Sequence, residues 1–138
     1  CGESHAWMRF RVFADTPADF EQWKKDQLAE AATPVTEAET MGESLFLTKG
    51  CVACHAISGL PGAVGVRGPN LTHIGSRTTL AAGIMPMNTD HLVEWLTDPN
   101  EIKPGNIMSK EAPVYTNQDM SLEAGDIRAL TAYLQSLR

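Results

Sequence analysis

The chain has 138 residues, a length that suits one compact domain with a short appendage. Its formal net charge of −6 argues against nucleic acid as a partner, because phosphate binding needs clustered lysine and arginine side chains. The sequence has no run of about 18 apolar residues, so it predicts no membrane span. No signal peptide is recognisable either, and we expect a chain that begins at Cys1 to be cut from a longer protein.

Soft metal ligands lie at the start of the chain. Cys1, His5 and Met8 supply a thiolate, an imidazole and a thioether. These donors suit copper, but three of them do not complete a copper site, and a cysteine near a histidine is common. Cys1 is also the odd one among three cysteines, because the other two belong to a motif further along.

Two elements and a linker are predicted next. Apolar residues alternate with others over 8–14, which predicts a half-buried strand. Thr16 is a suitable N-cap and is followed by proline, so we expect a short helix over 17–27. Residues 28–36 are rich in alanine, and we interpret them as a linker between two units.

A second helix is predicted to open the larger unit. Residues 36–39 read T-x-x-E, the pattern of a capping box, and Met41 and Leu45 belong to its predicted apolar stripe. Gly42 lies inside this helix, where glycine is unfavourable, so we expect close packing at that position. Gly50 is a natural end for the helix.

The motif that organises the chain follows at once. Cys51, Cys54 and His55 form C-V-A-C-H, which matches the C-x-x-C-H pattern of covalent haem c attachment. Two thiols at this spacing can each add to a vinyl group of one porphyrin, and His55 can then reach the iron. A redox dithiol or half of a zinc site is the alternative, but neither needs the adjacent histidine, and no second C-x-x-C or H-x-x-x-H lies downstream.

The rest of the chain predicts loops around a large group, with two further helices. Residues 56–79 are rich in glycine and proline and have no regular period, so we expect a long functional loop there. A helix is predicted from Asn88 until Pro99. Residues 101–120 are turn-rich, and Ser121 is the predicted cap of a final helix.

One further side chain could close the sixth position on the iron. Met108 is the strongest candidate, because the preceding K-P-G-N-I predicts a stiff, non-helical loop that would present its thioether. Met120 is the main rival. The remaining candidates have ordinary interpretations. Met85 and Met87 would fill gaps in the packing. His73 would be a polar loop residue, and His91 would lie in the first turn of a helix.

Several motifs occur in the order typical of class I cytochromes c. Besides C-V-A-C-H, they are G-E-S-L-F at 42–46, G-P-N-L at 68–71, I-G-S-R at 74–77, W-L-T-D-P at 95–99 and K-P-G-N-I-M at 103–108. Residues 37–138 therefore resemble a class I cytochrome c domain. The resemblance implies an all-α class I cytochrome c fold around one covalent haem c.

That resemblance also implies roles for single residues. His55 and Met108 would be the axial ligands of the haem iron, and the Pro69 carbonyl would accept a hydrogen bond from the other nitrogen of His55. Arg77 would face a haem propionate, and Trp95 would line the pocket beside Met108.

Two more implications concern packing and a departure from the pattern. Gly42 and Phe46 would pack against Tyr133 where the first and last helices of the domain cross. Met87 stands where the mitochondrial proteins carry a propionate-bonding tryptophan, so the propionate environment differs from theirs.

The first eight residues resemble the last ligand loop of the copper A domain in cytochrome c oxidase subunit II, which reads C-G-x-x-H-x-x-M. By that resemblance Cys1, His5 and Met8 are copper A ligands in the longer parent, and the chain starts with a remnant strand and helix of a cupredoxin-like domain. The family's upstream ligands are absent from this chain. We therefore expect no copper on it.

A copper A loop followed closely by a cytochrome c is typical of subunit II of caa3-type oxidases. The resemblance implies a copper A remnant at 1–27, a linker at 28–36 and a haem domain at 37–138. It implies that the haem accepts one electron from an external donor protein and passes it to copper A, within a membrane-anchored complex of oxidase subunits that reduces oxygen and pumps protons. We expect a location in the periplasm or at the outer face of the bacterial cytoplasmic membrane.

Two other functions remain open on the sequence. A free soluble periplasmic cytochrome c would have the same haem domain, and only residues 1–27 argue against it. A haem enzyme or gas sensor would need an open iron site. Rapid carbon monoxide binding to the ferrous protein would favour an open site, whereas resistance would favour Met108 on the iron.

Overall fold

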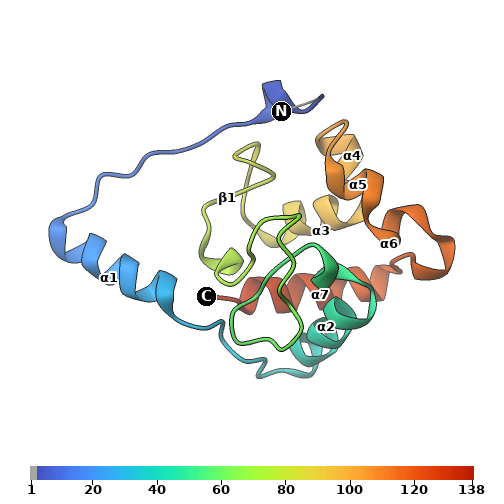
Figure 1. The fold of residues 1–138 in the computed structure, drawn as a ribbon, viewed down its shortest axis with the longest axis horizontal. Coiled ribbons are helices and arrows are strands. Elements are labelled where there is room, and N and C mark those ends of the chain that lie inside the picture. Colours follow the sequence, from blue (N-terminus) through green and yellow to red (C-terminus); the bar gives the residue numbers. More distant parts are fainter. Residues whose placement is uncertain (1–2) are drawn as a thin grey trace.

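The computed structural model describes residues 3–138, which form a mostly helical protein (Figure 1). The α-helices are α1 (Pro17–Leu28), α2 (Glu37–Thr48), α3 (Thr89–Thr97), α4 (Pro99–Ile102), α5 (Ile107–Glu111), α6 (Pro113–Thr116) and α7 (Ala124–Ser136). Short 3-10 turns are η1 (His5–Trp7), η2 (Cys51–Ala53), η3 (Ile74–Ser76) and η4 (Gln118–Met120), and β1 (Thr79–Leu80) pairs with β2 (Met85–Pro86) as an antiparallel ribbon. No described helix is long and apolar enough to cross a membrane.

The crossing of α2 and α7 is the centre of the fold. Gly42 is buried there, and a Cβ at this position would lie 2.5 Å from Cβ of Tyr133. One turn later the rings of Phe46 and Tyr133 meet edge to face, with centroids 6.0 Å apart. The expectation that Gly42 and Phe46 pack against Tyr133 is confirmed. Around this crossing lies a continuous apolar core that includes Ile57, Leu71, Leu92, Leu96, Leu130, Leu134 and Leu137.

Three predicted helix starts agree with the structure because their caps are local. Thr16 accepts a hydrogen bond from the Asp19 amide, Thr36 forms the expected capping box, and Asn88 accepts from the His91 amide. Each contact closes within three residues, so it depends little on the rest of the chain. The helix predicted over 17–27 is α1.

Three other expectations are wrong in detail. Residues 8–14 are extended but form no strand, because one backbone hydrogen bond, from the Arg9 amide to the Ala82 carbonyl, does not make a ladder with another described segment. Met41 is 55% exposed, since the buried face of α2 is set by Gly42 and Phe46 against α7. The last helix begins after Glu123, which forms its own capping box, and not after Ser121.

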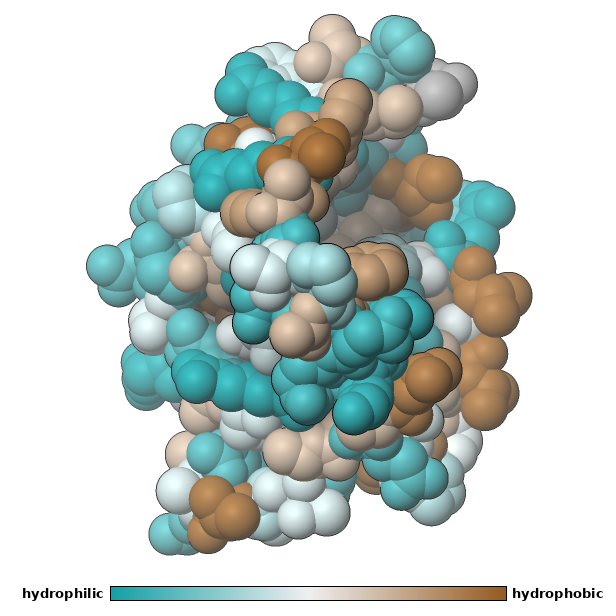
Figure 2. Space-filling view, turned by 90° about the vertical axis from the view of Figure 1, so that its left-hand side faces the viewer, coloured by the Kyte–Doolittle hydropathy of each residue, from teal (hydrophilic) through white to brown (hydrophobic). Residues whose placement is uncertain are grey.

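The segment predicted to be a linker is partly attached to the domain formed by residues 37–138, which we call the haem unit after the resemblance given above. His73 Nε2 donates to the Ala29 carbonyl at 3.1 Å, and the Ala31 amide donates to the Ser58 carbonyl at 3.0 Å. Residues 10–28 are exposed and include α1, none of whose residues is buried. The face on the side where α1 lies is largely hydrophilic, and separate hydrophobic patches interrupt it (Figure 2).

Candidate haem site

A cavity of about 620 Å³ lies between the helices and the long loop. Its walls are mostly apolar and come from every part of the haem unit; they include Phe46, Leu71, Ile74, Leu80, Leu92, Leu96, Leu130 and Leu134. A cavity of this size and character is typical of cofactor sites, which are concave, apolar and equipped with few polar groups.

The C-x-x-C-H motif forms one side of the cavity. Gly50 adopts a left-handed conformation (φ 82°) after α2, and the 3-10 turn η2 then brings Cys51, Cys54 and His55 to the cavity wall. The amides of Cys54 and His55 both donate to the Cys51 carbonyl, at 3.1 and 3.0 Å, so the motif is one tight turn. Both cysteines are free and half-buried, and burial raises the pKa of Cys51 to about 11.

The His55 ring is oriented by its neighbours. Its Nδ1 lies 2.8 Å from the Pro69 carbonyl oxygen and must carry the proton to donate to it, as the resemblance implied. Gly68 provides the room, because a Cβ there would lie 2.5 Å from His55 Cε1. Burial, with a smaller contribution from Arg77, lowers the pKa of His55. The ring is therefore held neutral with Nε2 available as a metal ligand.

Met108 lines the same cavity from a different element. It is half-buried in the first turn of α5, so the expectation of a non-helical loop is wrong at this residue. Asn106 caps the helix by accepting from the Ser109 amide at 2.9 Å, and its own amide group donates to the carbonyls of Pro99 and Lys103 at 2.8 Å. This buried asparagine fixes the position of the helix that presents Met108.

Polar and aromatic side chains complete the wall. Arg77 and Trp95 line the cavity, and Arg77 donates to the Asn70 carbonyl while desolvation lowers its pKa. Tyr115 was missed by sequence reasoning. Its hydroxyl donates to the Leu96 carbonyl at 2.8 Å, and burial raises its pKa. The one sequence signal for Tyr115 is that it is an aromatic residue within the turn-rich segment 101–120, which has no helical period.

The rival ligands lie elsewhere. His73 and His91 are engaged with backbone carbonyls, and the His91 Nδ1 lies 2.8 Å from the Pro86 carbonyl oxygen. Among the described residues that line the cavity, the methionines are Met108 and Met8, and they do not include the other candidates, which are Met85, Met87 and Met120. Met108 is therefore the predicted ligand that the fold brings together with the C-x-x-C-H turn.

The structure describes two of the three predicted copper ligands. Cys1 lies outside the described residues, His5 begins η1, and Met8 follows that turn at the cavity mouth. Residues 3–138 contain no group of three or more histidine, cysteine, aspartate or glutamate side chains arranged to hold a metal.

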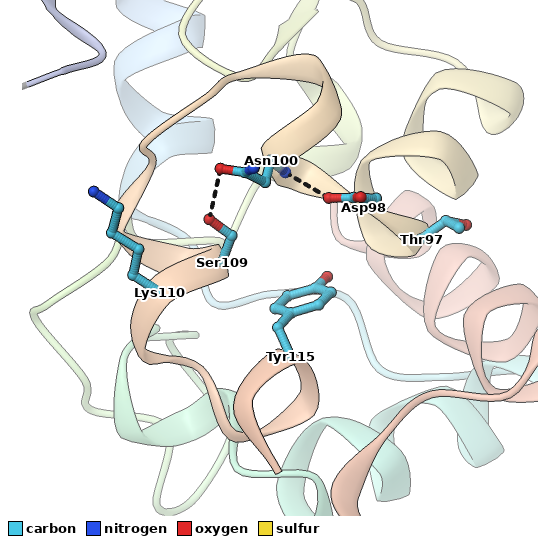
Figure 3. Close-up of a pocket in the computed structure, with 6 residues that line it drawn as sticks. All are labelled: Thr97, Asp98, Asn100, Ser109, Lys110 and Tyr115. Carbon is cyan, nitrogen blue, oxygen red and sulfur yellow. Dashed lines mark hydrogen bonds between the residues drawn. The ribbon is translucent and has the colours of Figure 1, made fainter. Parts of the chain in front are cut away.

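A second, polar cavity of about 420 Å³ lies beside the first (Figure 3). It is lined by Thr97, Asp98, Asn100, Ser109, Lys110 and Tyr115. Its carboxylate is already used, because Asp98 accepts from the amides of Asn100 and Glu101 at the start of α4. We assign it no cofactor.

Comparison with known proteins decides the family. Residues 40–138 match the family model for cytochrome c. The chain belongs to the cytochrome c family. Membership implies a covalently bound haem c and electron transfer through it, and the apolar cavity with its C-x-x-C-H turn fits such a group.

Relatives of this cytochrome c family member match beyond the haem domain. They are cytochrome c oxidase subunit 2 of Alkalihalophilus pseudofirmus (36% identity over 138 residues), of Bacillus subtilis (34% over 140) and of Bacillus sp. strain PS3 (39% over 141). Each alignment covers the whole of this chain and 37% of the relative. The chain thus spans little more than a third of these proteins, and its resemblance to oxidase subunit II is confirmed over its full length.

Proposed function

We propose that this chain holds one haem c through Cys51, Cys54, His55 and Met108 and relays single electrons to a copper A centre of the same polypeptide. The observation that carries the proposal is that these four side chains line one apolar cavity. When bound, the haem supplies an iron centre that changes its charge by one electron.

The protein's own residues account for the rest of this function. Cys51 and Cys54 present two sulfurs on one turn for thioether bonds, and the Pro69 carbonyl holds the His55 ring in place. Met108 would be the second side chain that holds the iron, and a Met/His pair raises the reduction potential relative to two histidines. An iron held by both side chains would favour electron transfer over substrate or gas binding.

The relay to copper A is supported by the region outside the haem domain. The whole-chain alignments include residues 1–39, which precede the matched family region, and the relatives are named cytochrome c oxidase subunit 2. A free carrier would not need those residues. Tethering two redox centres in one polypeptide raises their effective concentration to about the millimolar range, so tight docking is unnecessary.

The wider setting belongs to the same proposal. The chain would work within a complex of oxidase subunits at the outer face of the bacterial cytoplasmic membrane, because haem c is attached outside the cytoplasm. An external protein would supply the electrons, and oxygen reduction and proton pumping would take place at sites elsewhere in the complex.

The axial ligand is tested with a matched pair of methionine variants. The ferric wild-type protein should show the weak near-infrared band of a Met-ligated haem, and the ferrous protein should resist carbon monoxide. Met108→Leu should lose the band and bind carbon monoxide rapidly, whereas Met120→Leu, outside the cavity, should behave as wild type. A Met108→Leu protein that keeps the band would refute this ligation.

The relay is tested in the full-length oxidase. Replacing Cys51 and Cys54 by alanine removes the haem attachment, and donor-driven reduction of copper A should then fail while copper A still accepts electrons from a small chemical reductant. Normal donor-driven reduction of copper A in this variant would show that the haem is not on the path.

A further inference from the structure

The described N-terminal residues cross the mouth of the haem cavity. We call residues 3–9 the N-terminal strap, and Ser4, Met8 and Arg9 from it line the cavity. Figure 1 shows this segment above the β1–β2 loop and close to α4, far along the sequence from both. The strap therefore contacts the part of the haem unit that opens to the surface.

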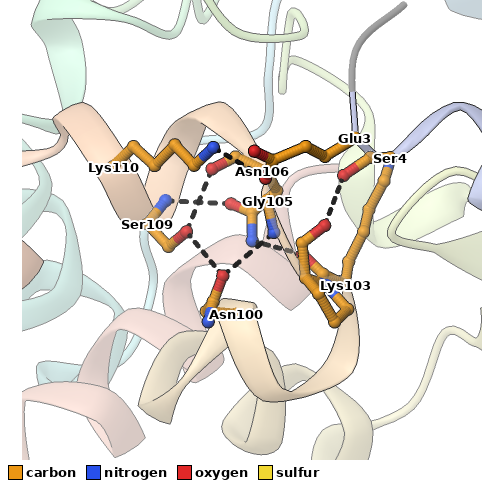
Figure 4. A network of polar contacts seen from close by, with 9 residues as sticks. Glu3, Ser4, Asn100, Lys103, Gly105, Asn106, Ser109 and Lys110 are labelled. Carbon is orange, nitrogen blue, oxygen red and sulfur yellow. Dashed lines mark hydrogen bonds and ion pairs between the residues drawn. The ribbon is translucent and has the colours of Figure 1, made fainter.

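One end of the strap is attached to the segment that carries Met108 (Figure 4). Ser4 Oγ donates to the Pro104 carbonyl at 2.8 Å, and the Glu3 carboxylate pairs with Lys110 Nζ at 2.8 Å. A Cβ on Gly105 would clash with the Glu3 side chain, so the strap lies directly on this backbone. Pro104 and Lys110 flank Met108 in the sequence.

The other end is attached to the β1–β2 loop. The Arg9 amide donates to the Ala82 carbonyl at 2.8 Å, and a Cβ on Gly83 would lie 2.9 Å from Arg9. Beyond this point the contacts stop, because residues 10–15 are exposed and extended. The strap is thus held at both ends, whereas the chain that follows it is not.

One ion pair joins the strap to this surface. The basic side chains of the cavity lining have partners of their own in two cases, because Lys49 pairs with Asp126 and Arg67 pairs with Glu111. Lys110, outside that lining, pairs with Glu3 of the strap.

We propose that the surface formed by residues 80–83 and 103–110 is an intramolecular docking site for the copper-ligand loop of the same polypeptide. This inference rests on the proposed relay function, which assigns residues 1–8 to that loop. Lys110 and the Pro104 carbonyl act as positioning groups, because they bind Glu3 and Ser4 and so hold the loop against this surface.

The first test measures the strap in the haem-loaded 138-residue protein by amide hydrogen exchange. Lys110→Glu should accelerate exchange at the Arg9 amide by about two- to fivefold, the range expected for one exposed ion pair. The double variant Glu3→Lys with Lys110→Glu should restore protection. Lys24→Glu is the matched control, because it breaks the Lys24–Glu21 pair, also 2.8 Å long, away from the strap. Equal exchange in the Lys110 and Lys24 variants would overturn the docking site.

The second test follows electron transfer from haem to copper A in the full-length oxidase after rapid reduction of the haem. Lys110→Glu should slow this step at least about twofold, and the double reversal should restore it. An unchanged rate would refute the positioning role while leaving the relay intact. If copper A is not reduced from the haem even in the wild-type enzyme, the relay itself fails, and the exchange experiment still decides the docking site.

Discussion

Replacing Gly42 by alanine tests the packing that holds the haem unit together. Gly42 is buried where α2 crosses α7, and the added Cβ would lie 2.5 Å from Tyr133 Cβ and closer still to the Ala129 carbonyl oxygen. Neither atom belongs to the flexible end of a side chain. The methyl group fits only if the two helices move apart.

The expected change combines two opposing terms. Alanine is a better helix former than glycine by about 1 kcal/mol, which alone would stabilise α2. Overpacking a close contact costs about 1–3 kcal/mol, and the upper part of this range applies because separating the helices also disturbs the Phe46–Tyr133 contact. The net result should be a loss of about 1–2 kcal/mol in the free energy of unfolding.

Urea unfolding of the haem-loaded protein, followed by circular dichroism, measures this loss. Gly125→Ala is the matched control, since Gly125 lies in α7 and a Cβ there meets nothing within 4 Å. The control should gain up to about 1 kcal/mol. If Gly42→Ala is as stable as the wild type, or if both variants shift in the same direction, the close-packing argument is wrong.

Two further predictions concern the axial segment and alkaline pH. Asn106→Ala removes the side-chain amide that donates to two carbonyls and caps α5. We expect the free energy of unfolding in urea to fall by about 1–3 kcal/mol and the near-infrared band of Met108 ligation to weaken. An unchanged band would show that the cap does not position Met108. Burial, with a smaller effect from Glu43, raises the pKa of Tyr133 from its usual value near 10 to about 12. The folded state therefore holds this proton more tightly than the unfolded state, so stability should fall as pH rises between about 10 and 12, and Tyr133→Phe should remove that part of the fall.

The features of the fold and the site that follow from the residues alone, without the resemblance to class I cytochromes c, are local. The C-x-x-C-H turn closes through hydrogen bonds to Cys51, and the caps at Thr16, Thr36 and Asn88 are each satisfied three residues later. Such contacts need only a short peptide. Their residue types are therefore visible in the sequence without knowledge of the partner helices.

The errors have the opposite character. The sequence predicts Met41 on a buried stripe, but the face of α2 that is buried depends on where α7 lies. Residues 8–14 have the alternation of a strand, but a strand needs a neighbour to receive its hydrogen bonds. The role of Tyr115 depends on a contact between separate helices, because its hydroxyl in α6 donates to the Leu96 carbonyl in α3.

The sequence alone thus predicts haem attachment at Cys51, Cys54 and His55, and it predicts the starts of most helices, because these depend on neighbours a few residues apart. Only the tertiary structure decided that Met108 sits in a capped helix at the same cavity, and that residues 3–9 lie across its mouth. Those arrangements join segments up to about a hundred positions apart, as in the bond from Ser4 to Pro104. Local propensity carries no information about such pairs. The chain between them must first be ordered at a cost in entropy, so the contact stabilises the protein only once the whole chain has folded.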